Sequence, residues 1–183
     1  MAARTIPDLL GAARRAGRSV LLEPEGYALL DAVGIRTPRH LFVRNSAEAA
    51  LVDTAGFAGA RIVIKVVSPE ILHKSDVGGI AIVANRPDAV RAAVQKMEAR
   101  LGENALEGFL LCEFVPYDAG LGGEFLLGLR WTEEFGTVLT IGPGGVYAEF
   151  LAGNFKAGRD VAILSPAVRW LAGMGRMLRP DVG

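Results

Sequence analysis

The stretch from Arg61 to Ile80, RIVIKVVSPEILHKSDVGGI, gathers residue types that could bind or transfer a phosphate. Lys65 lies inside an apolar run typical of a β-strand, and a polar loop with His73 and Lys74 follows it. The pair Gly78–Gly79 then opens a second apolar run. Lysines supply positive charge, and a glycine pair can present successive backbone N–H groups to an anion. The stretch is therefore a candidate phosphate site.

Each of these residues also has a purely structural interpretation. A lysine in mid-strand, such as Lys65, must either extend to the surface or meet an anion. His73 could attack phosphorus through its neutral imidazole and carry the phosphoryl group, or it could be an ordinary solvated loop histidine. Gly78–Gly79 is equally compatible with a plain tight turn. Taken one by one, the residues leave both interpretations open.

Two carboxylates and a second glycine-rich segment extend the candidate site. Glu113 lies near the end of an apolar run, and Glu124 follows the loop between the two halves of the chain. Either carboxylate could accept a hydrogen bond from an adenine amino group or a ribose hydroxyl, although exposed strand carboxylates are common. Gly142–Gly145 could close over a nucleotide or serve only as a turn. The second histidine, His40, lies in an ordinary strand, so no histidine metal site is indicated.

Length and composition restrict the class of protein. The 183 residues are 51% hydrophobic and 22% charged, which favours one domain or two closely associated lobes with a substantial core. A net charge of zero argues against a nucleic-acid-binding protein. The single cysteine, Cys112, excludes an internal disulfide framework and fits the reducing cytoplasm. No apolar run reaches the roughly 20 residues that span a membrane, so we expect a cytoplasmic protein that binds neither nucleic acid nor membrane.

The elements expected to position these residues mix strands and helices as in an α+β protein. The expected helices are an N-terminal amphipathic helix with Ile6, Leu9, Leu10 and Ala13 on one face, then Pro24 through Ala32, Ser46 to about Ala55, residue 85 or 86 to Leu101, and Pro166 to Leu178. The expected strands are Arg39–Val43, Ile62–Val67, Gly79–Ala84, Phe109–Val115, Glu124–Leu129, Thr137–Ile141, Val146–Leu151 and Val161–Leu164.

The motifs in their order resemble one family. They are LLEPEGYALLDAVGIRTP, IVIKVVSPEILHKSDVGGI, LCEFVP, GGEFLLGLRWTEEFG, TIGPGGVYAEFL and DVAILSP. Over about residues 17–178 the chain resembles the ATP-grasp (β) component of ADP-forming acyl-CoA synthetases such as acetate–CoA ligase, which are relatives of succinyl-CoA synthetase. The resemblance implies one ATP-grasp domain over residues 1–183, with two α+β lobes that hold the nucleotide between them. The N-terminal segment and first lobe would cover 17–116, and an incomplete second lobe 117–183.

The resemblance also implies an activity and residue roles. The family interconverts acyl-CoA, ADP and phosphate with the free acid, CoA and ATP, and it uses Mg²⁺. The acyl phosphate forms on a CoA-binding partner component, and His73 matches the histidine that relays the phosphoryl group within the ATP-grasp component. The positions implied to bind nucleotide or phosphate are Lys65, Lys74, Gly78, Gly79, Glu113, Phe114, Val115, Glu124, Gly144 and Gly145.

The chain departs from the family pattern in three places. Thr132 stands where the family often has aspartate, and Thr137 replaces a proline. The family's late strand with an acidic residue and Asn-Pro, which helps to hold Mg²⁺, has no counterpart here, so the metal ligands are expected outside this chain. The chain would then be a fragment of a longer protein or a shortened, inactive member. Two further alternatives stay open: a non-catalytic nucleotide-binding regulatory module, and an ATP-grasp ligase that joins an acid to an amine.

Overall fold

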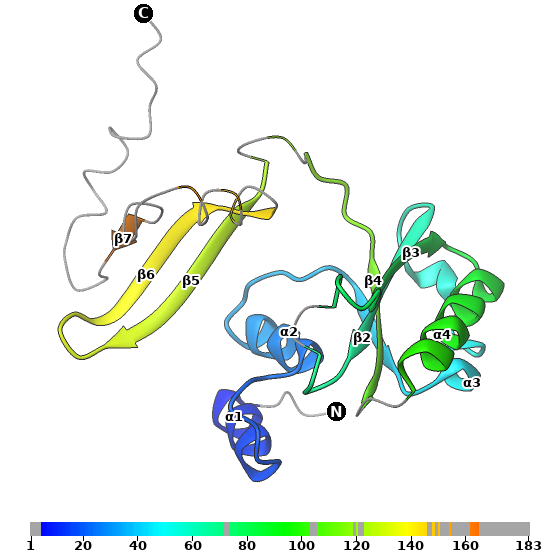
Figure 1. The fold of residues 1–183 in the computed structure, drawn as a ribbon, viewed down its shortest axis with the longest axis horizontal. Helices are drawn as coiled ribbons and strands as arrows, with labels where there is room; N and C mark the ends of the chain where they lie inside the picture. The colour runs from blue at the N-terminus through cyan, green and yellow to red at the C-terminus, as the bar shows by residue number, and fades with distance from the viewer. Residues whose placement is uncertain are drawn as a thin grey trace, which may run out of the picture. The chain divides into compact units, whose positions relative to one another are not determined.

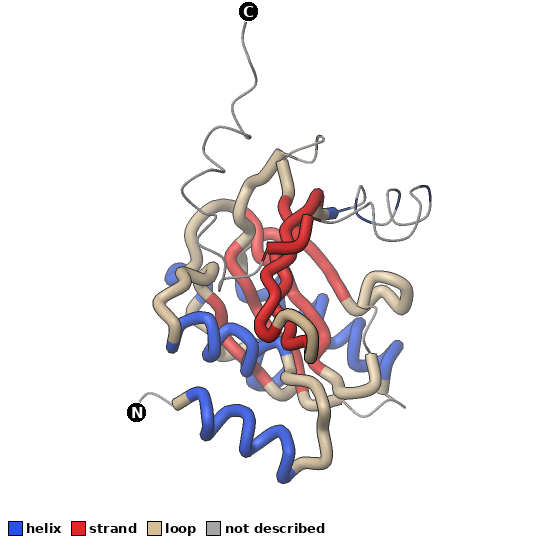
Figure 2. Tube along the Cα trace, turned by 90° about the vertical axis from the view of Figure 1, so that its left-hand side faces the viewer, coloured by secondary structure: helices blue, strands red, loops and turns tan. Residues whose placement is uncertain are grey.

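The computed structural model describes residues 5–71, 74–102, 106–118, 120, 123–145, 148, 150, 154 and 162–164. The chain divides into two compact units, residues 1–115 and residues 116–183. Helices and strands both contribute, as Figure 2 shows by colour, which confirms the α+β prediction. Across the described ranges, no helix has the length and apolar character needed to cross a bilayer.

The first unit is built around an antiparallel sheet. Its strands are β1 (His40–Val43), β2 (Arg61–Val67), β3 (Ile80–Ala84) and β4 (Gly108–Glu113), which in the described part of the unit lie in the order β1-β4-β2-β3 (Figure 1). The two central strands, β2 and β4, are rich in β-branched and other apolar residues, which favour a pleated, buried surface. Each edge strand pairs with one of them, β1 with β4 and β3 with β2.

The main core lies where helices cover one face of this sheet. The helices are α3 (Ser46–Ala49) and α4 (Pro87–Leu101), with a short 3₁₀ turn η1 (Thr54–Gly56). The helical spacing of Val90, Val94, Met97 and Leu101 places all four on the buried side of α4. They pack against alternate side chains of β2, namely Ile62, Ile64 and Val66, and against Phe109 and Leu111 of β4.

A smaller cluster forms with the other set of alternating side chains. Val67, Leu110 and Cys112 are buried there, and Leu22, Tyr27 and Val63 pack against them. This cluster brings in helix α2 (Glu23–Ala32), which follows α1 (Ile6–Arg15). Helix α2 ends at Ala32 as predicted, and Gly34, two residues beyond, has a φ of +77°. In α1, Leu9 and Ala13 are buried, whereas Leu10, expected on the same face, is 40% exposed.

The second unit is an antiparallel sheet in the residues that the structure describes. Strands β5 (Phe125–Thr132), β6 (Gly136–Pro143) and β7 (Ala162–Leu164) lie in the order β5-β6-β7. The β5–β6 hairpin is closed at Thr132, whose hydroxyl oxygen accepts a hydrogen bond from the Phe135 amide at 3.2 Å. Gly136 has a φ of +67°, a conformation that glycine adopts without steric cost.

Two predicted elements are wrong. The helix expected from Ser46 to about Ala55 ends at Ala49, and its N-cap is Asn45, whose side chain accepts from the Glu48 amide. Leu51, which would continue the helix, is 86% exposed and buries nothing. The strand expected at Val146–Leu151 is contradicted by Ala148 and Phe150, which are helical. The helix expected at Pro166–Leu178 lies outside the described residues.

Candidate functional site

Lys65 meets a carboxylate of its own chain. It lies in the middle of β2, opposite Ile80 on one side and Leu110 on the other. Its side chain belongs to the face of Val63 and Val67 and not to the main core. The Lys65 Nζ donates to Glu23 Oε1 at 2.5 Å. Of the two alternatives predicted for this lysine, the surface or an anion, the structure shows an anion, the Glu23 carboxylate.

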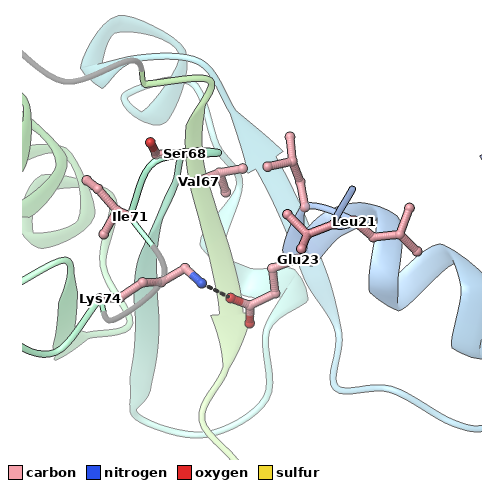
Figure 3. Close-up of a pocket in the computed structure, with 8 residues that line it drawn as sticks. Leu21, Glu23, Val67, Ser68, Ile71 and Lys74 are labelled. Atoms are coloured by element: carbon pink, nitrogen blue, oxygen red, sulfur yellow. Dashed lines mark ion pairs between the residues drawn. The ribbon is translucent and has the colours of Figure 1, made fainter. Parts of the chain in front are cut away.

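The same carboxylate also binds Lys74. The Lys74 Nζ lies 3.2 Å from Glu23 Oε2 (Figure 3). The two oxygens of Glu23 therefore each face a different lysine. The side chains of Lys65, Lys74 and Glu23 are 25%, 22% and 20% exposed. One lysine comes from a strand and the other from the following loop, and together with Glu23 they leave one net positive charge in a half-buried place.

The position of Glu23 follows from how α2 begins. Glu23 is the first residue of α2 and Pro24 the second, and an acidic residue in the first turn interacts favourably with the helix dipole. Glu25 anchors this helix end. Its carboxylate accepts from the Leu22 amide at 2.7 Å and from both terminal nitrogens of Arg18 at 2.7 Å. The helix start is thus held independently of the lysines.

Tyr27 and Cys112 complete the surroundings of Lys65. The Tyr27 hydroxyl lies 3.5 Å from the Lys65 Nζ and 3.3 Å from Glu23 Oε1. The Cys112 Sγ lies 4.0 Å from the same hydroxyl. Burial raises the pKa of Tyr27 to about 12 and also raises the pKa of the Cys112 thiol. Both groups therefore stay neutral near pH 7 beside the ion pair.

The pKa values of the ion pair move apart. Burial by itself raises the pKa of Glu23, but the hydrogen bond and charge of Lys65, with a contribution from Lys74, leave that pKa below its ordinary value. Burial lowers the pKa of Lys65, but the hydrogen bond and charge of Glu23 leave it above its ordinary value. The carboxylate and the ammonium each keep the other ionised.

A small cavity of about 80 Å³ adjoins the cluster (Figure 3). It is lined by Val20, Leu21, Leu22, Glu23, Val67, Ser68, Ile71 and Lys74. Sites for drug-sized ligands usually occupy about 300 Å³ or more, so this cavity has room for a small group rather than a nucleotide.

Gly78 and Gly79 form a tight turn. The Gly78 amide donates to the Ser75 carbonyl at 3.1 Å, and the Gly79 amide donates to the Lys74 carbonyl at 2.6 Å. Both N–H groups are therefore used within the loop, and the structure favours the turn over the anion-binding alternative. The Val66 amide donates to the Gly79 carbonyl at 2.7 Å, which ties the turn to β2.

His73, the predicted phosphoryl relay, lies outside the described residues. Its neighbour in the sequence, Lys74, belongs to the cluster with Glu23.

The predicted adenine-binding segment lies at the end of β4. Glu113 ends the strand, and its carboxylate accepts from the Arg39 amide at 3.3 Å. The Arg61 guanidinium stacks on the Phe114 ring at 3.8 Å, and Val115 is 51% exposed. Glu113 pairs with Ile62 across the strands, three residues before Lys65, which is roughly 10 Å along a strand.

The second unit brings three predicted residues together. The Gly144 amide donates to the Glu124 carbonyl at 2.9 Å. Gly145 has a φ of +60°, and a Cβ there would overlap the Glu124 carboxylate. The left-handed backbone conformation therefore favours glycine at this position, and a larger residue would also displace the Glu124 carboxylate.

The described part of the chain contains no cluster of three or more His, Cys, Asp or Glu residues that could hold a metal ion such as magnesium. No magnesium ligand is assigned.

Sequence reasoning missed Glu23 and Tyr27 as members of the site. Both residues lie in the motif LLEPEGYALLDAVGIRTP, which by itself indicates only the family. A signal was present for Lys65, since a lysine within an apolar strand needs either solvent or an anion. Nothing in the sequence, however, connects positions 42 residues apart.

Comparison with known proteins supplies a family. The ATP-grasp domain family matches residues 12–158. The chain is similar to the ADP-forming 4-hydroxybutyrate–CoA ligase of Nitrosopumilus maritimus, with 35% identity. The matched region covers 73% of this chain and 19% of that ligase. It is also similar to the β subunit of ADP-forming acetate–CoA ligase I of Pyrococcus furiosus, with 33% identity. That match covers 72% of this chain and 56% of the β subunit. The chain thus spans from about a fifth to somewhat over half of these relatives.

Solved structures agree with the sequence relatives. Acetyl-coenzyme A synthetase 1 of Ca. Korarchaeum cryptofilum, in complex with coenzyme A and Ca-AMPCP, matches with a TM-score of 0.70 and 30% identity over 88% of this chain and 67% of that one. The same synthetase with a phosphorylated phosphohistidine segment matches with a TM-score of 0.69 and 28% identity, over 88% of this chain and 66% of that one.

Proposed function

The chain belongs to the ATP-grasp domain family, and we propose that it is the ATP/ADP-binding part of an ADP-forming acid–CoA ligase. The observation that carries this proposal is the convergence of Lys65 and Lys74 on the single carboxylate of Glu23. These two lysines already bind an anion of their own chain. A phosphate placed beside them would meet the same positive potential.

The chemistry of phosphoryl transfer supports this assignment. Catalysis of that reaction consists mainly of positioning and of neutralising charge on the transferred group. Lys65 and Lys74 supply the charge. Gly78 and Gly79 shape the turn beside them. Mg²⁺ would supply further charge neutralisation when bound with the nucleotide.

We assign the relay of the phosphoryl group to His73. A nitrogen of the neutral imidazole attacks the terminal phosphorus of ATP, the N–P bond forms as the bond to the ADP oxygen breaks, and ADP leaves. In the reverse direction ADP takes the group from the phosphohistidine. Support comes from the chain itself, since His73 precedes Lys74 directly, and from the phosphohistidine segment of the Korarchaeum synthetase.

The remaining roles concern the nucleotide base and the second unit. Glu113 and the backbone of Phe114 and Val115 would contact adenine. Glu124, Gly144 and Gly145 would contribute from the second unit, where they already contact one another.

The proposal includes a CoA-binding component. The Pyrococcus relative is named as a β subunit, and the Korarchaeum synthetase is solved with coenzyme A. The acyl phosphate would be made and used on that component, which is either a separate subunit or a further part of the same polypeptide. The complete reaction would take place in the cytoplasm.

The test compares the full enzyme, reconstituted with its CoA-binding component, with its His73→Asn variant. The wild-type enzyme is expected to bind ADP and to form an acid-labile phosphoenzyme from ATP. The variant should lose the phosphoenzyme and bind ADP within a few-fold of wild type, because the imidazole is not needed to hold the nucleotide. His40→Asn is the matched control, since His40 contacts the Pro38 carbonyl and the Tyr27 ring.

Normal turnover in the His73→Asn enzyme would exclude the relay. ADP binding without any phosphoenzyme in the wild type, with the partner and Mg²⁺ present, would favour a regulatory nucleotide-binding module instead.

A further inference from the structure

We propose that Glu23 is a positioning residue for phosphate binding, because it holds the ammonium groups of Lys65 and Lys74 at one place where both can contact the same phosphate. This inference rests on the proposed function and adds a residue to it. Glu23 acts through the lysines and does not touch the nucleotide.

The two ammonium groups have N–H donors left for a phosphate beside Glu23. Each oxygen of the carboxylate faces one ammonium, at 2.5 Å for Lys65 and 3.2 Å for Lys74. An ammonium has three N–H donors. Lys65 directs one to Glu23 and one towards the Tyr27 hydroxyl, and Lys74 directs one to Glu23. A phosphate can therefore bind the same lysines without displacing the carboxylate.

Glu23 is suited to ordering two long side chains because its own backbone is held. The start of α2 is anchored by the Arg18–Glu25 ion pair and by the bond from the Leu22 amide to Glu25. Leu22 also packs on the cluster of buried β2 and β4 side chains. Lysine loses much rotamer freedom when it is ordered, and a carboxylate on a rigid helix end removes that cost before the nucleotide arrives.

Electrostatics supports the same role. The groups that face Lys65 are Glu23 and Tyr27 from α2 and Cys112 from β4, with Lys74 on the far oxygen of Glu23. Burial lowers the pKa of Lys65, and the hydrogen bond and charge of Glu23 outweigh that effect. Without the carboxylate, burial and the charge of Lys74 would both favour the neutral amine, which binds phosphate poorly.

A competing role makes the opposite prediction. If Glu23 occupied the place of the phosphate, the nucleotide would have to displace it, and removing the charge would tighten binding. Glu23→Gln distinguishes the two roles, since it keeps the size of the side chain and one oxygen acceptor but removes the charge.

The test measures the dissociation constant of ADP by calorimetry, on the full chain, from about pH 7 to about pH 10, a range that includes the ordinary cysteine pKa and reaches that of lysine. In the wild type, Lys65 should stay charged over this pH range because its pKa is raised, so its titration should change ADP affinity little. Glu23→Gln should bind ADP about tenfold more weakly near pH 7, the size of one lost charge-assisted bond, and weaken further as the pH rises. Glu23→Asp should restore the pH-independence but not the full affinity, because its shorter carboxylate keeps the charge and reaches the lysines less well.

Two controls separate positioning from a general structural effect. Glu25→Gln removes a carboxylate from the same helix turn and should lower stability without steepening the pH dependence of ADP binding. Cys112→Ser removes the thiol, whose titration could otherwise contribute to the alkaline change.

The outcomes distinguish this inference from the proposed function. Tighter ADP binding by Glu23→Gln, or unchanged affinity with the pH dependence of wild type, overturns the positioning role and leaves nucleotide binding intact. Failure of the wild-type chain to bind ADP overturns the proposed function and this inference with it. If Glu23→Gln does not fold, Glu23→Asp still decides, because wild-type affinity in that variant would contradict the need for a carboxylate that reaches both lysines.

Discussion

Replacing Gly79 with alanine should destabilise the first unit through a steric conflict. A Cβ on Gly79 would lie well inside 3.0 Å of Val66 Cγ1 and 3.1 Å from the Lys74 carbonyl oxygen. Val66 is fully buried, so its side chain has little space to move. Two hydrogen bonds fix Gly79 against its neighbours. The Val66 amide donates to the Gly79 carbonyl at 2.7 Å, and the Gly79 amide donates to the Lys74 carbonyl at 2.6 Å.

The expected cost follows from this lack of space. Overpacking a buried place by one methyl group typically costs about 1–3 kcal/mol, and we expect about 2 kcal/mol for Gly79→Ala because neither neighbour can withdraw. For a unit of this size that corresponds to a melting temperature lower by about 8 °C. Urea unfolding followed by far-ultraviolet circular dichroism measures the free energy, with the slope against urea expected to stay unchanged.

Gly26→Ala is the matched control for this substitution. Gly26 lies within α2, and a Cβ there would meet nothing within 4 Å. Alanine is the better helix former, so this variant should gain about 1 kcal/mol. If Gly79→Ala unfolds at the same urea concentration as the wild type while Gly26→Ala is stabilised, the close packing of the turn on β2 does not hold the loop in place.

Two further predictions concern α2 and its ion pairs. The stability that Lys65 contributes is fully present below its ordinary pKa of 10.5 and is lost as the pH rises through its raised folded pKa. The stability that Glu23 contributes is present above its ordinary pKa of 4.5 and is lost as the pH falls through its lowered folded pKa. The urea midpoint of the wild type should therefore fall at both low and high pH. The midpoint of Glu23→Gln should fall less at both ends, because the ion pair is already absent. Equal pH dependence of the two midpoints would contradict the pairing. Arg18→Gln should cost about 1–2 kcal/mol in urea unfolding, because it removes two charge-assisted bonds to Glu25, and an unchanged midpoint would show that the helix start does not depend on this pair.

The sequence predicted most of the elements whose signal is local. The β-branched run at Ile62–Val67 and the periodic valines of α4 gave boundaries within two residues, because burial of a strand and of one helix face leaves a pattern that short windows detect. The motifs also gave the ATP-grasp family and its fold, which the comparisons confirm.

The failures come from contacts that the sequence does not display. The helix after Asn45 ended early because Leu51 has no apolar surface to cover. The partner of Lys65 was predicted only as some anion, since Glu23 reaches it through the packing of α2 and not through any local spacing. The Gly78–Gly79 pair was left open between a nest and a turn, and the choice depends on where two amide hydrogens point. The roles of the nucleotide-binding positions remain predictions.

The central place of β2 has a consequence for amide hydrogen exchange in the candidate site. Lys65 lies on a strand that is bonded to a neighbour on each side, so its amide should exchange only when the whole first unit opens. Lys74 lies in a turn outside the sheet, where amides can exchange through local opening. A phosphate bound between them would slow exchange around Lys74, because local opening of the turn would have to release it. It would also slow exchange at Lys65, because a bound ligand raises the free energy of opening the whole unit. The site thus joins a strand whose exchange reports on the stability of the whole first unit to a turn whose exchange reports on local contact with the ligand.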